Sequence, residues 1–393
     1  IDSIQKEEIL KDYQDKVLSS PIPITTRSKP VNYAINIKRE EALKKDIQFI
    51  TKLNIPHDIA MEDPDLYLLL SNLLDNAINH IGIGKKIEVE MHDINDSTFM
   101  IKVAIVGSGR IVPQMLEAMQ TVPGWEVVAI CGRSREKAAR FGIPDVYTDY
   151  AQMLARRDID FVYIALPNSL HFAAAKQALL AGRNVLCEKP FTSTVEQAEE
   201  LFALAEERGL WIFEAISNIH LPNFRKVQEL LPQIGPVRLV HADYDEHFPR
   251  YDLYLDGAEI PVFSQEYEGG ALRDINIYCL HVVLALFGRP DAVSYASNAT
   301  GRNAVGTSGV ATLTYGKQGL VAVCTASMDS DGLRGFFFQG EKGAIRVHGL
   351  PNFFTRVDLM LPGQEVQSFE LNRYEHRLCH QLEDYRDIFA ARD

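Results

Sequence analysis

The sequence predicts an α/β protein in which a doubly wound parallel sheet is followed by an α+β domain with a large, mainly antiparallel sheet. Strand-like and helix-like segments alternate from residue 100 to about residue 219, as in a parallel sheet covered by helices on both faces. From about residue 237, strand-like runs follow one another with turns between them and one early helix, which favours an antiparallel sheet. The first hundred residues form a separate α+β pattern.

Length and composition limit the class of protein. At roughly 100–200 residues per domain, 393 residues suggest two or three domains, and the changes of pattern divide the chain into 1–99, 100–219 and 220–393. No apolar run of about 20 residues is present, which argues against a membrane span, and no signal peptide is apparent. A net charge of -13 argues against a nucleic-acid partner. Five scattered cysteines favour a reducing cytoplasm, and no metal site is predicted, because Cys379-His380 fits helix packing better.

The first turn of the parallel sheet is the candidate ligand site. The β-branched run 101–106 stops at a Gly-Ser-Gly turn, and apolar residues then recur at helical spacing. Gly107 permits a tight turn, Gly109 lets a phosphate approach the backbone, and the helix that follows offers free N–H groups. This pattern predicts the start of a Rossmann-type dinucleotide site. Val112 replaces the usual third small residue, and an ordinary strand–helix turn is the alternative. The candidate cofactor-binding residues of this turn are Gly107, Ser108, Gly109, Arg110 and Ile111.

The end of the second strand bears on the choice of cofactor. An acidic residue that would bind the adenosine ribose 2′-OH is expected there, but Arg133 and Ser134 are present instead. A guanidinium and a hydroxyl suit a 2′-phosphate, so NADP is predicted, with NAD as the alternative. A solvated basic turn before the next helix is the alternative interpretation.

Two further motifs follow strands of the parallel sheet, where ligands of such sheets bind. One is ALPNSLH and the other is CEKPF. Their candidate residues are Pro167, Asn168, His171, Glu188, Lys189 and Pro190.

The order and spacing of GSGRIV, PNSLH and CEKP resemble the Gfo/Idh/MocA family of NAD(P)-dependent oxidoreductases over about residues 100–393. This resemblance implies that Lys189 lies between nicotinamide and substrate, where it hydrogen-bonds the reacting oxygen. It implies that Glu188 and Pro190 shape the cofactor pocket, and that Asn168 and His171 lie along the nicotinamide side.

The early helix of the last segment carries the remaining candidate catalytic residues. Asp274 and Tyr278 are four residues apart on one predicted helix face, with His281 one turn further on. The family motif Asp-x-Gly-x-His/Tyr resembles Asp274-Ile-Asn-Ile-Tyr278, with Asn276 in place of glycine. The tyrosine form resembles dehydrogenases in which tyrosine is the acid–base group, and a neighbouring Lys189 cation would assist it. His281 is either a substrate contact or a core histidine, and Asp274 alone could simply favour the helix dipole.

The resemblance also implies that the open face of the last domain forms a subunit contact, so a homodimer or homotetramer is expected. The final run HRLCHQLEDYRDIFAARD reads as a closing helix, whereas family members usually continue through one more helix. The domain is therefore expected to be truncated at its C-terminus.

The first segment gives a different resemblance. SNLLDNAINH within residues 25–99 resembles the N-box of GHKL-type sensor histidine kinases, an α+β fragment of a Bergerat-type fold. The resemblance implies that Asn72 and Asn76 would contact Mg²⁺ and phosphate. The family's adenine loop and glycine-rich lid do not follow, so ATP binding is not expected, and a core helix with a polar rim is the alternative.

Together these patterns predict an oxidoreductase that transfers a hydride between a nicotinamide cofactor and a sugar, a polyol or a related compound. Lys189, Tyr278 and Asp274 are the predicted catalytic residues. Two alternatives are an NAD(P)-binding sensor without turnover and a kinase-like ATP-binding module in the first segment.

Overall fold

The computed structural model describes residues 29–53, 70–71, 74, 77–78, 86–91, 100–298 and 305–391. The chain divides into two compact units between Phe99 and Met100.

The described part of the first unit is small and has an apolar core of its own. Helix α2 (Lys29–Lys44) precedes the parallel strand pair β1 (Gln48–Leu53) and β2 (Lys86–Met91). The predicted helix after residue 66 is described only at residues 70, 71, 74, 77 and 78, all of which are helical. Its Leu70 and Leu74 pack against α2 residues Val31 and Ile35. The predicted N-box positions Asn72 and Asn76 lie outside the described residues.

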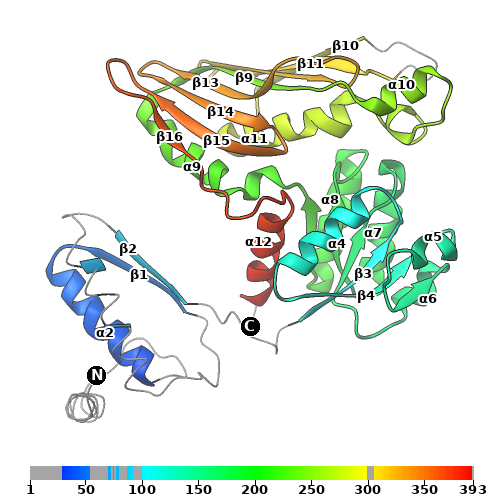
Figure 1. Cartoon of the computed structure of the whole chain (residues 1–393), viewed down its shortest axis with the longest axis horizontal. Helices are drawn as coiled ribbons and strands as arrows, with labels where there is room; N and C mark the ends of the chain where they lie inside the picture. The colour runs from blue at the N-terminus through cyan, green and yellow to red at the C-terminus, as the bar shows by residue number, and fades with distance from the viewer. Residues whose placement is uncertain are drawn as a thin grey trace. The chain divides into compact units, whose positions relative to one another are not determined.

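A six-stranded parallel sheet begins the second unit, in the order β5-β4-β3-β6-β7-β8. Figure 1 labels β3 and β4 of this sheet and the helices near them. Its strands are β3 (Ile101–Val106), β4 (Trp125–Cys131), β5 (Asp145–Tyr147), β6 (Phe161–Ile164), β7 (Asn184–Glu188) and β8 (Ile212–Ala215). Its helices are α4 (Ile111–Thr121), α5 (Arg135–Ala139), α6 (Tyr150–Leu154), α7 (His171–Leu180) and α8 (Val195–Arg208). The central strands β6 and β7 are buried throughout, as near-continuous apolar runs predict. The predicted doubly wound sheet is confirmed.

The second sheet has eight strands in the order β10-β11-β12-β9-β13-β14-β15-β16. All neighbours are antiparallel except the pair β9 and β12, so the predicted mainly antiparallel sheet is also confirmed. Its strands are β9 (Val237–Asp245), β10 (Ala292–Ser297), β11 (Ser308–Tyr315), β12 (Leu320–Ser327), β13 (Arg334–Gly340), β14 (Ala344–Leu350), β15 (Phe353–Met360) and β16 (Gln367–Phe369).

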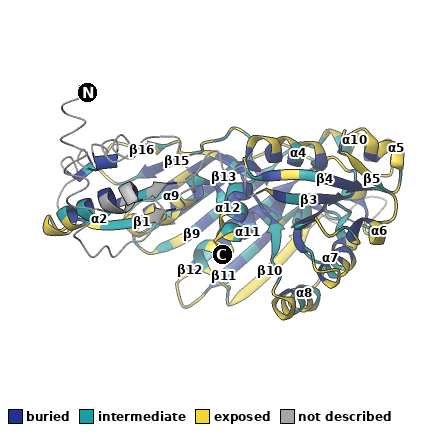
Figure 2. Cartoon of the chain, turned by 90° about the horizontal axis from the view of Figure 1, so that it is seen from below, coloured by how far each residue is buried: buried dark blue, intermediate teal, exposed yellow. Residues whose placement is uncertain are grey.

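The helices of this part are more numerous than the sequence pattern suggested. They are α9 (Pro222–Leu230), α10 (Pro249–Leu255), the π-helical turn η5 (Leu272–Asn276), α11 (Ile277–Phe287) and α12 (Cys379–Ala390). Proline at the first position of α9 and α10 marks both starts, because it needs no hydrogen-bond acceptor there. Side chains of α9 and α11 join those of the sheet in one apolar core. Strand β10 lies at the edge of the sheet and is exposed along its whole length (Figure 2).

The last helix returns to the first sheet of this unit. The ring of Tyr385 stacks on Phe213 of β8 at 4.6 Å between centroids, and Phe389 meets Phe161 of β6 edge to face at 5.0 Å. The Tyr385 hydroxyl donates to the Glu214 carbonyl over 2.6 Å. Residues from the end of the chain thus complete the packing of the parallel sheet.

Candidate active site

The turn between β3 and α4 is closed on one side and open on the other. Gly107 has a φ of +116°, and a Cβ at this position would lie 2.1 Å from the Ala165 carbonyl oxygen, so only glycine fits. At Gly109 the nearest atom to such a Cβ would be 3.8 Å away. No side chain caps α4 at Arg110. The Val112 amide donates to the Gly109 carbonyl over 3.2 Å and Pro113 has no N–H, so among the first three residues of the helix the Ile111 amide is the donor available to a phosphate. The loop and the first residue of α4 contain four of the predicted cofactor residues: Ser108, Gly109, Arg110 and Ile111.

The end of β4 lies beside this turn. A Cβ at Gly132 would come 3.6 Å from the Ser108 hydroxyl oxygen. Arg133 is exposed and makes no ion pair with any described residue, so its guanidinium is available. The Ser134 hydroxyl accepts from the Lys137 amide over 3.3 Å and caps α5, yet its own hydrogen remains available. No carboxylate follows β4 directly, and this arrangement of donors fits a dinucleotide that carries a 2′-phosphate.

Asn168 and His171 connect the loop after β6 to other loops of the second unit. The amide nitrogen of Asn168, which follows Pro167 at the end of β6, donates to the Glu268 carbonyl over 3.1 Å. His171 is fully buried, and its ring nitrogens lie 2.9 Å from the carbonyl oxygens of Leu166 and Pro190. His171 therefore ties the loop after β6 to the loop after β7.

Lys189 directly follows β7 and reaches across to the π-helical turn η5. Its ammonium lies 2.6 Å from the Asp274 carbonyl oxygen and 2.8 Å from Asp274 Oδ1. Burial lowers the pKa of Lys189, but the attraction of Asp274, Tyr278 and Glu188 outweighs it, and that pKa is raised. Burial raises the pKa of Asp274, but the charge and hydrogen bond of Lys189 outweigh it, and that pKa is lowered. Both groups are charged at neutral pH.

Tyr278, in the first turn of α11, belongs to the same cluster. The Lys189 ammonium lies over its ring, 5.3 Å from the centroid, and the tyrosine is only 4% exposed. Glu188, next to the lysine, accepts from the Tyr163 hydroxyl over 2.6 Å and is buried. The structure thus brings Lys189, Asp274 and Tyr278 together at the carboxyl end of the parallel sheet.

His281 has a different partner. Its Nε2 lies 3.2 Å from Glu214 Oε2, and it has no contact with Lys189 among the interactions of the described residues. Asn276, where the family motif has glycine, is fully buried and donates from Nδ2 to the Cys324 carbonyl over 3.0 Å. Asn276 therefore anchors η5 to strand β12.

Sequence reasoning missed Arg377. The guanidinium of this residue, just before α12, lies 3.5 Å from the Tyr278 hydroxyl through Nη1 and 3.1 Å from Gln114 Oε1 through Nη2. Nearly a hundred residues separate Arg377 from Tyr278, and no local motif marks it.

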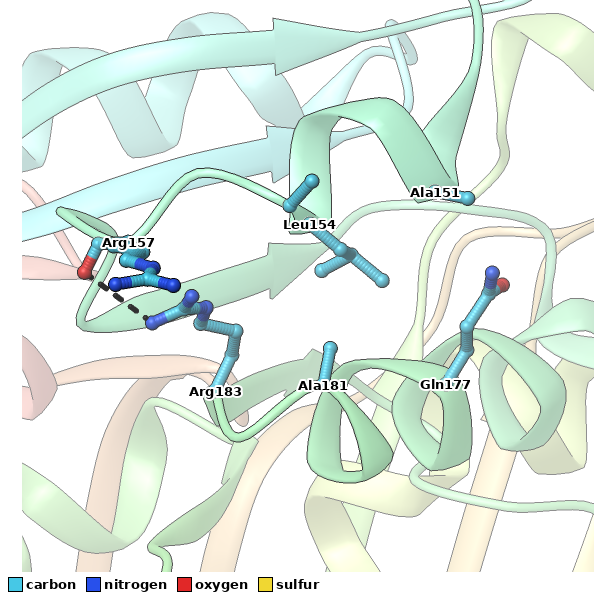
Figure 3. Close-up of a pocket in the computed structure, with 7 residues that line it drawn as sticks. Ala151, Leu154, Arg157, Gln177, Ala181 and Arg183 are labelled. Carbon is cyan, nitrogen blue, oxygen red and sulfur yellow. Dashed lines mark hydrogen bonds between the residues drawn. The ribbon is translucent and has the colours of Figure 1, made fainter.

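A shallow hollow of about 370 Å³ lies elsewhere, between α6 and α7 (Figure 3). Arg157 and Arg183 lie at one end of it and Gln177 at the other, and an Arg183 nitrogen donates to the Arg157 carbonyl over 3.4 Å. None of the predicted site residues lines this hollow, so it is separate from the cluster around Lys189.

The described residues show neither a membrane-spanning helix nor a cluster of metal ligands. No helix among them is both long and apolar enough to span a membrane. They also contain no group of three or more histidine, cysteine, aspartate or glutamate side chains that could hold a metal ion.

Comparison with known proteins places these features in context. A model described as an oxidoreductase family with an NAD-binding Rossmann fold matches residues 101–215, and a model of the GFO/IDH/MocA C-terminal domain matches residues 224–346. The chain is 34% identical to scyllo-inositol 2-dehydrogenase (NADP(+)) IolU of Bacillus subtilis, over 63% of this chain and 75% of that protein. It is 31% identical to the uncharacterized oxidoreductase YgjR of Escherichia coli, over 72% of this chain and 87% of that protein.

Among solved structures, KijD10, a 3-ketoreductase from Actinomadura kijaniata crystallised with NADP and TDP-benzene, is similar with a TM-score of 0.64 and 28% identity. The similarity covers 74% of this chain and 90% of KijD10. The two family models match residues 101–215 and 224–346, so neither adds support to the resemblance of the first segment to histidine kinases, which stays a prediction.

Proposed function

Because the chain belongs to the Gfo/Idh/MocA oxidoreductase family, we propose that residues 100–391 transfer a hydride between NADP and a carbon–oxygen group of a sugar or polyol. The observation that carries the proposal is the cluster of Lys189, Asp274 and Tyr278 at the carboxyl end of the parallel sheet. The relatives support the substrate class, since one is named as an inositol dehydrogenase and another as a ketoreductase.

The turn after β3 and the end of β4 would hold the cofactor. The Ile111 amide at the start of α4 suits its pyrophosphate, and Arg133 with Ser134 suits a 2′-phosphate. When bound, the nicotinamide supplies or accepts the hydride. The protein's own residues must then bind the substrate oxygen, orient it and move one proton.

Lys189 would orient the substrate oxygen. Two of its three N–H donors are engaged by Asp274, which fixes the ammonium and leaves one donor for the substrate. Asp274 also keeps the lysine charged despite its burial, so the cation polarises a carbonyl oxygen and stabilises negative charge as it develops.

Tyr278 would move the proton. In the direction of reduction, its O–H bond breaks as the substrate oxygen gains the proton and the carbonyl carbon gains the hydride. In oxidation the same oxygen takes the proton from the carbinol. The phenol suits this role because it is withdrawn from water and faces the Lys189 cation.

A sensor that binds NADP without turnover is the second candidate function. Such a protein needs the glycine turn but not a fixed ammonium beside a buried tyrosine. The Lys189–Asp274 pair, whose side chains are 14% and 25% exposed, therefore favours turnover, because withdrawing two charges from water costs free energy that cofactor binding alone does not require.

The test is turnover of the full chain with NADPH or NADP and a panel of ketoses, aldoses and inositols, in wild type, Lys189→Ala and Tyr278→Phe. Lys189→Ala should lower kcat/KM by about 10²–10⁴, with NADPH affinity within a few-fold of wild type. Tyr278→Phe should lose rate mainly in kcat. Unchanged turnover in Lys189→Ala would refute the assignment, and NADPH binding with no turnover of any compound would favour the sensor.

We also propose that the outer face of the eight-stranded sheet joins copies of this chain. One row of outward residues crosses neighbouring strands through Thr312, Val323, His241 and Phe337, and all four are partly exposed. Light scattering of the purified chain should give a dimer or tetramer, and a monomer would contradict this. The five free, buried cysteines support a cytoplasmic location, where thiols stay reduced.

A further inference from the structure

Arg377 links the proposed acid–base residue to helix α4, which begins at the proposed cofactor site. Its Nη1 donates to the Tyr278 hydroxyl oxygen over 3.5 Å, and its Nη2 donates to Gln114 Oε1 over 3.1 Å. Gln114 lies near the start of α4, the helix that begins at the proposed pyrophosphate site. One guanidinium thus spans the distance between the cofactor helix and Tyr278.

The direction of this hydrogen bond decides where the tyrosine proton goes. A guanidinium can only donate, so the Tyr278 oxygen accepts from Arg377 and its own hydrogen stays free. No described residue accepts that hydrogen, since the bond from Arg377 is the one hydrogen bond found at the hydroxyl. The phenol O–H is therefore left to donate to a substrate oxygen.

Arg377 also brings a charge that no carboxylate neutralises at close range. Among the described residues, none of the ion pairs within 4 Å includes Arg377, whereas the Lys189 ammonium is paired with Asp274. Burial lowers the pKa of Arg377, but the attraction of Tyr278, Glu188 and the neighbouring tyrosines outweighs it, and that pKa is raised. The guanidinium therefore remains charged beside the phenol oxygen.

We propose that Arg377 is a positioning residue for Tyr278, which directs the phenol proton at the substrate and stabilises the phenolate left after its transfer. The proposal rests on the proposed function of Tyr278. The proton balance is that of the reduction described above, in which the Tyr278 O–H bond breaks and a substrate O–H bond forms. Arg377 gives up no proton and acts through its charge and its hydrogen bond.

The first test compares Arg377→Gln and Arg377→Lys with wild type in steady-state turnover. Arg377→Gln should lower kcat about 10- to 100-fold, with KM and NADPH affinity within about threefold, because the lost interaction matters only when charge develops. Arg377→Lys keeps a cation and should lose less rate than Arg377→Gln. Equal kcat in wild type and in a folded Arg377→Gln variant would overturn the proposal.

Arg386→Gln is the matched control. Arg386 also joins α12 to the parallel-sheet part of the unit, through a hydrogen bond of 3.0 Å to the Pro123 carbonyl, but it has no contact with Tyr278. If the two arginines only anchor the helix, both variants lose stability and activity alike. If Arg377 positions Tyr278, only its variants lose kcat.

Two further readouts separate a positioning role from a structural one. In the Tyr278→Phe background, Arg377→Gln should lower kcat less than threefold, because the hydroxyl oxygen that Arg377 contacts is gone. Added guanidinium salts at millimolar concentration should restore part of the rate of Arg377→Ala but none of the rate of Tyr278→Phe. A full additional loss in the Tyr278→Phe background would overturn the proposal.

The same set distinguishes this proposal from the function on which it rests. If Tyr278→Phe turns over normally, the assignment of Tyr278 fails, and the positioning role fails with it. If Tyr278→Phe loses rate while Arg377→Gln does not, only the role of Arg377 is refuted.

Discussion

The charges around Lys189 divide into a paired set and an unpaired one. The ammonium is held by Asp274 through both a carboxylate and a carbonyl oxygen, whereas the guanidinium of Arg377 contacts only neutral oxygens at close range. A paired cation is fixed in position, and an unpaired one is free to respond to new negative charge. In the proposed mechanism, the paired Lys189 would hold the substrate oxygen and the unpaired Arg377 would respond to charge on Tyr278.

Arg133 should decide the choice of cofactor. Each charge-assisted hydrogen bond to a 2′-phosphate contributes about 1.5–3 kcal/mol, so NADPH should bind more tightly than NADH. Arg133→Ala should reduce the ratio of the NADH dissociation constant to the NADPH dissociation constant about 10- to 100-fold. Fluorescence titration with both cofactors measures this. Arg140→Ala, an exposed arginine paired with Glu136 nearby, should leave the ratio unchanged. Equal or better affinity of the wild type for NADH would show that the protein prefers NAD.

His380 should make stability depend on pH. The side chain is 1% exposed, and burial, with the charge of Arg373 next, lowers its pKa to about 4. The unfolded chain binds this proton below about pH 6.5, but the folded one does not until about pH 4. As the pH is lowered from about 6.5 to about 4, the free energy of unfolding should therefore decrease, by up to about 3 kcal/mol from this group.

His380→Gln tests this by removing the titrating group. Its amide oxygen can still accept from the Arg373 amide, which now donates to His380 Nε2 over 3.1 Å. Urea unfolding at pH 7, 6 and 5 should give a smaller loss of stability for His380→Gln than for wild type. If the free energy of unfolding changes equally with pH in the variant and in wild type, the pH dependence comes from other groups.

At the scale of elements, the turn between β3 and α4 is sterically the most restricted part of the cofactor site. Gly107→Ala would place a Cβ 2.1 Å from the Ala165 carbonyl oxygen, at a φ of +116°. We expect the free energy of unfolding to decrease by about 3 kcal/mol or more, and NADPH to bind more weakly. Thermal unfolding and NADPH titration measure both effects.

Gly142→Ala is its control. Gly142 also has a positive φ, of +68°, but no atom lies within 4 Å of the added Cβ. Gly142→Ala should lower the free energy of unfolding by only about 1 kcal/mol, through backbone strain, and leave NADPH binding unchanged. Similar losses in the two variants would show that strain alone, and not the contact with Ala165, restricts the turn.

The predicted elements and the site were accessible from the sequence to different degrees. The parallel strands and the Gly107 turn follow from periodicity and from local glycine chemistry. The spacing of Asp274 and Tyr278 predicted one helix face, but η5 is a π-helical turn, anchored by the buried Asn276, that no periodicity announces. Arg377 could not be predicted, because its partners Tyr278 and Gln114 meet it only in the folded chain.

At the scale of the molecule, residues 100–391 should bind NADPH and turn over without the first segment. The chain divides into separate compact units at Met100, and the residues of the proposed site all follow that position. A chain beginning at Met100 should keep NADPH affinity and kcat/KM within about twofold of the full chain. Loss of NADPH binding in the shortened chain would contradict this prediction.

The full chain should also show no ATP binding by isothermal titration with Mg-ATP. The kinase-like resemblance lacks the adenine loop and lid, so the N-box asparagines alone should not form a nucleotide site. A dissociation constant below about 100 µM, or about -5.5 kcal/mol, would show that the first segment keeps such a site.

The return of α12 to the parallel sheet has a consequence for synthesis on the ribosome. Phe161 of β6 packs edge to face against Phe389, and Phe213 of β8 stacks on Tyr385. At about 5–20 residues per second, Phe161 is synthesised roughly ten to fifty seconds before Phe389. During that interval the nascent sheet exposes an apolar surface, so a chaperone that shields newly made chains should raise the yield of the native protein.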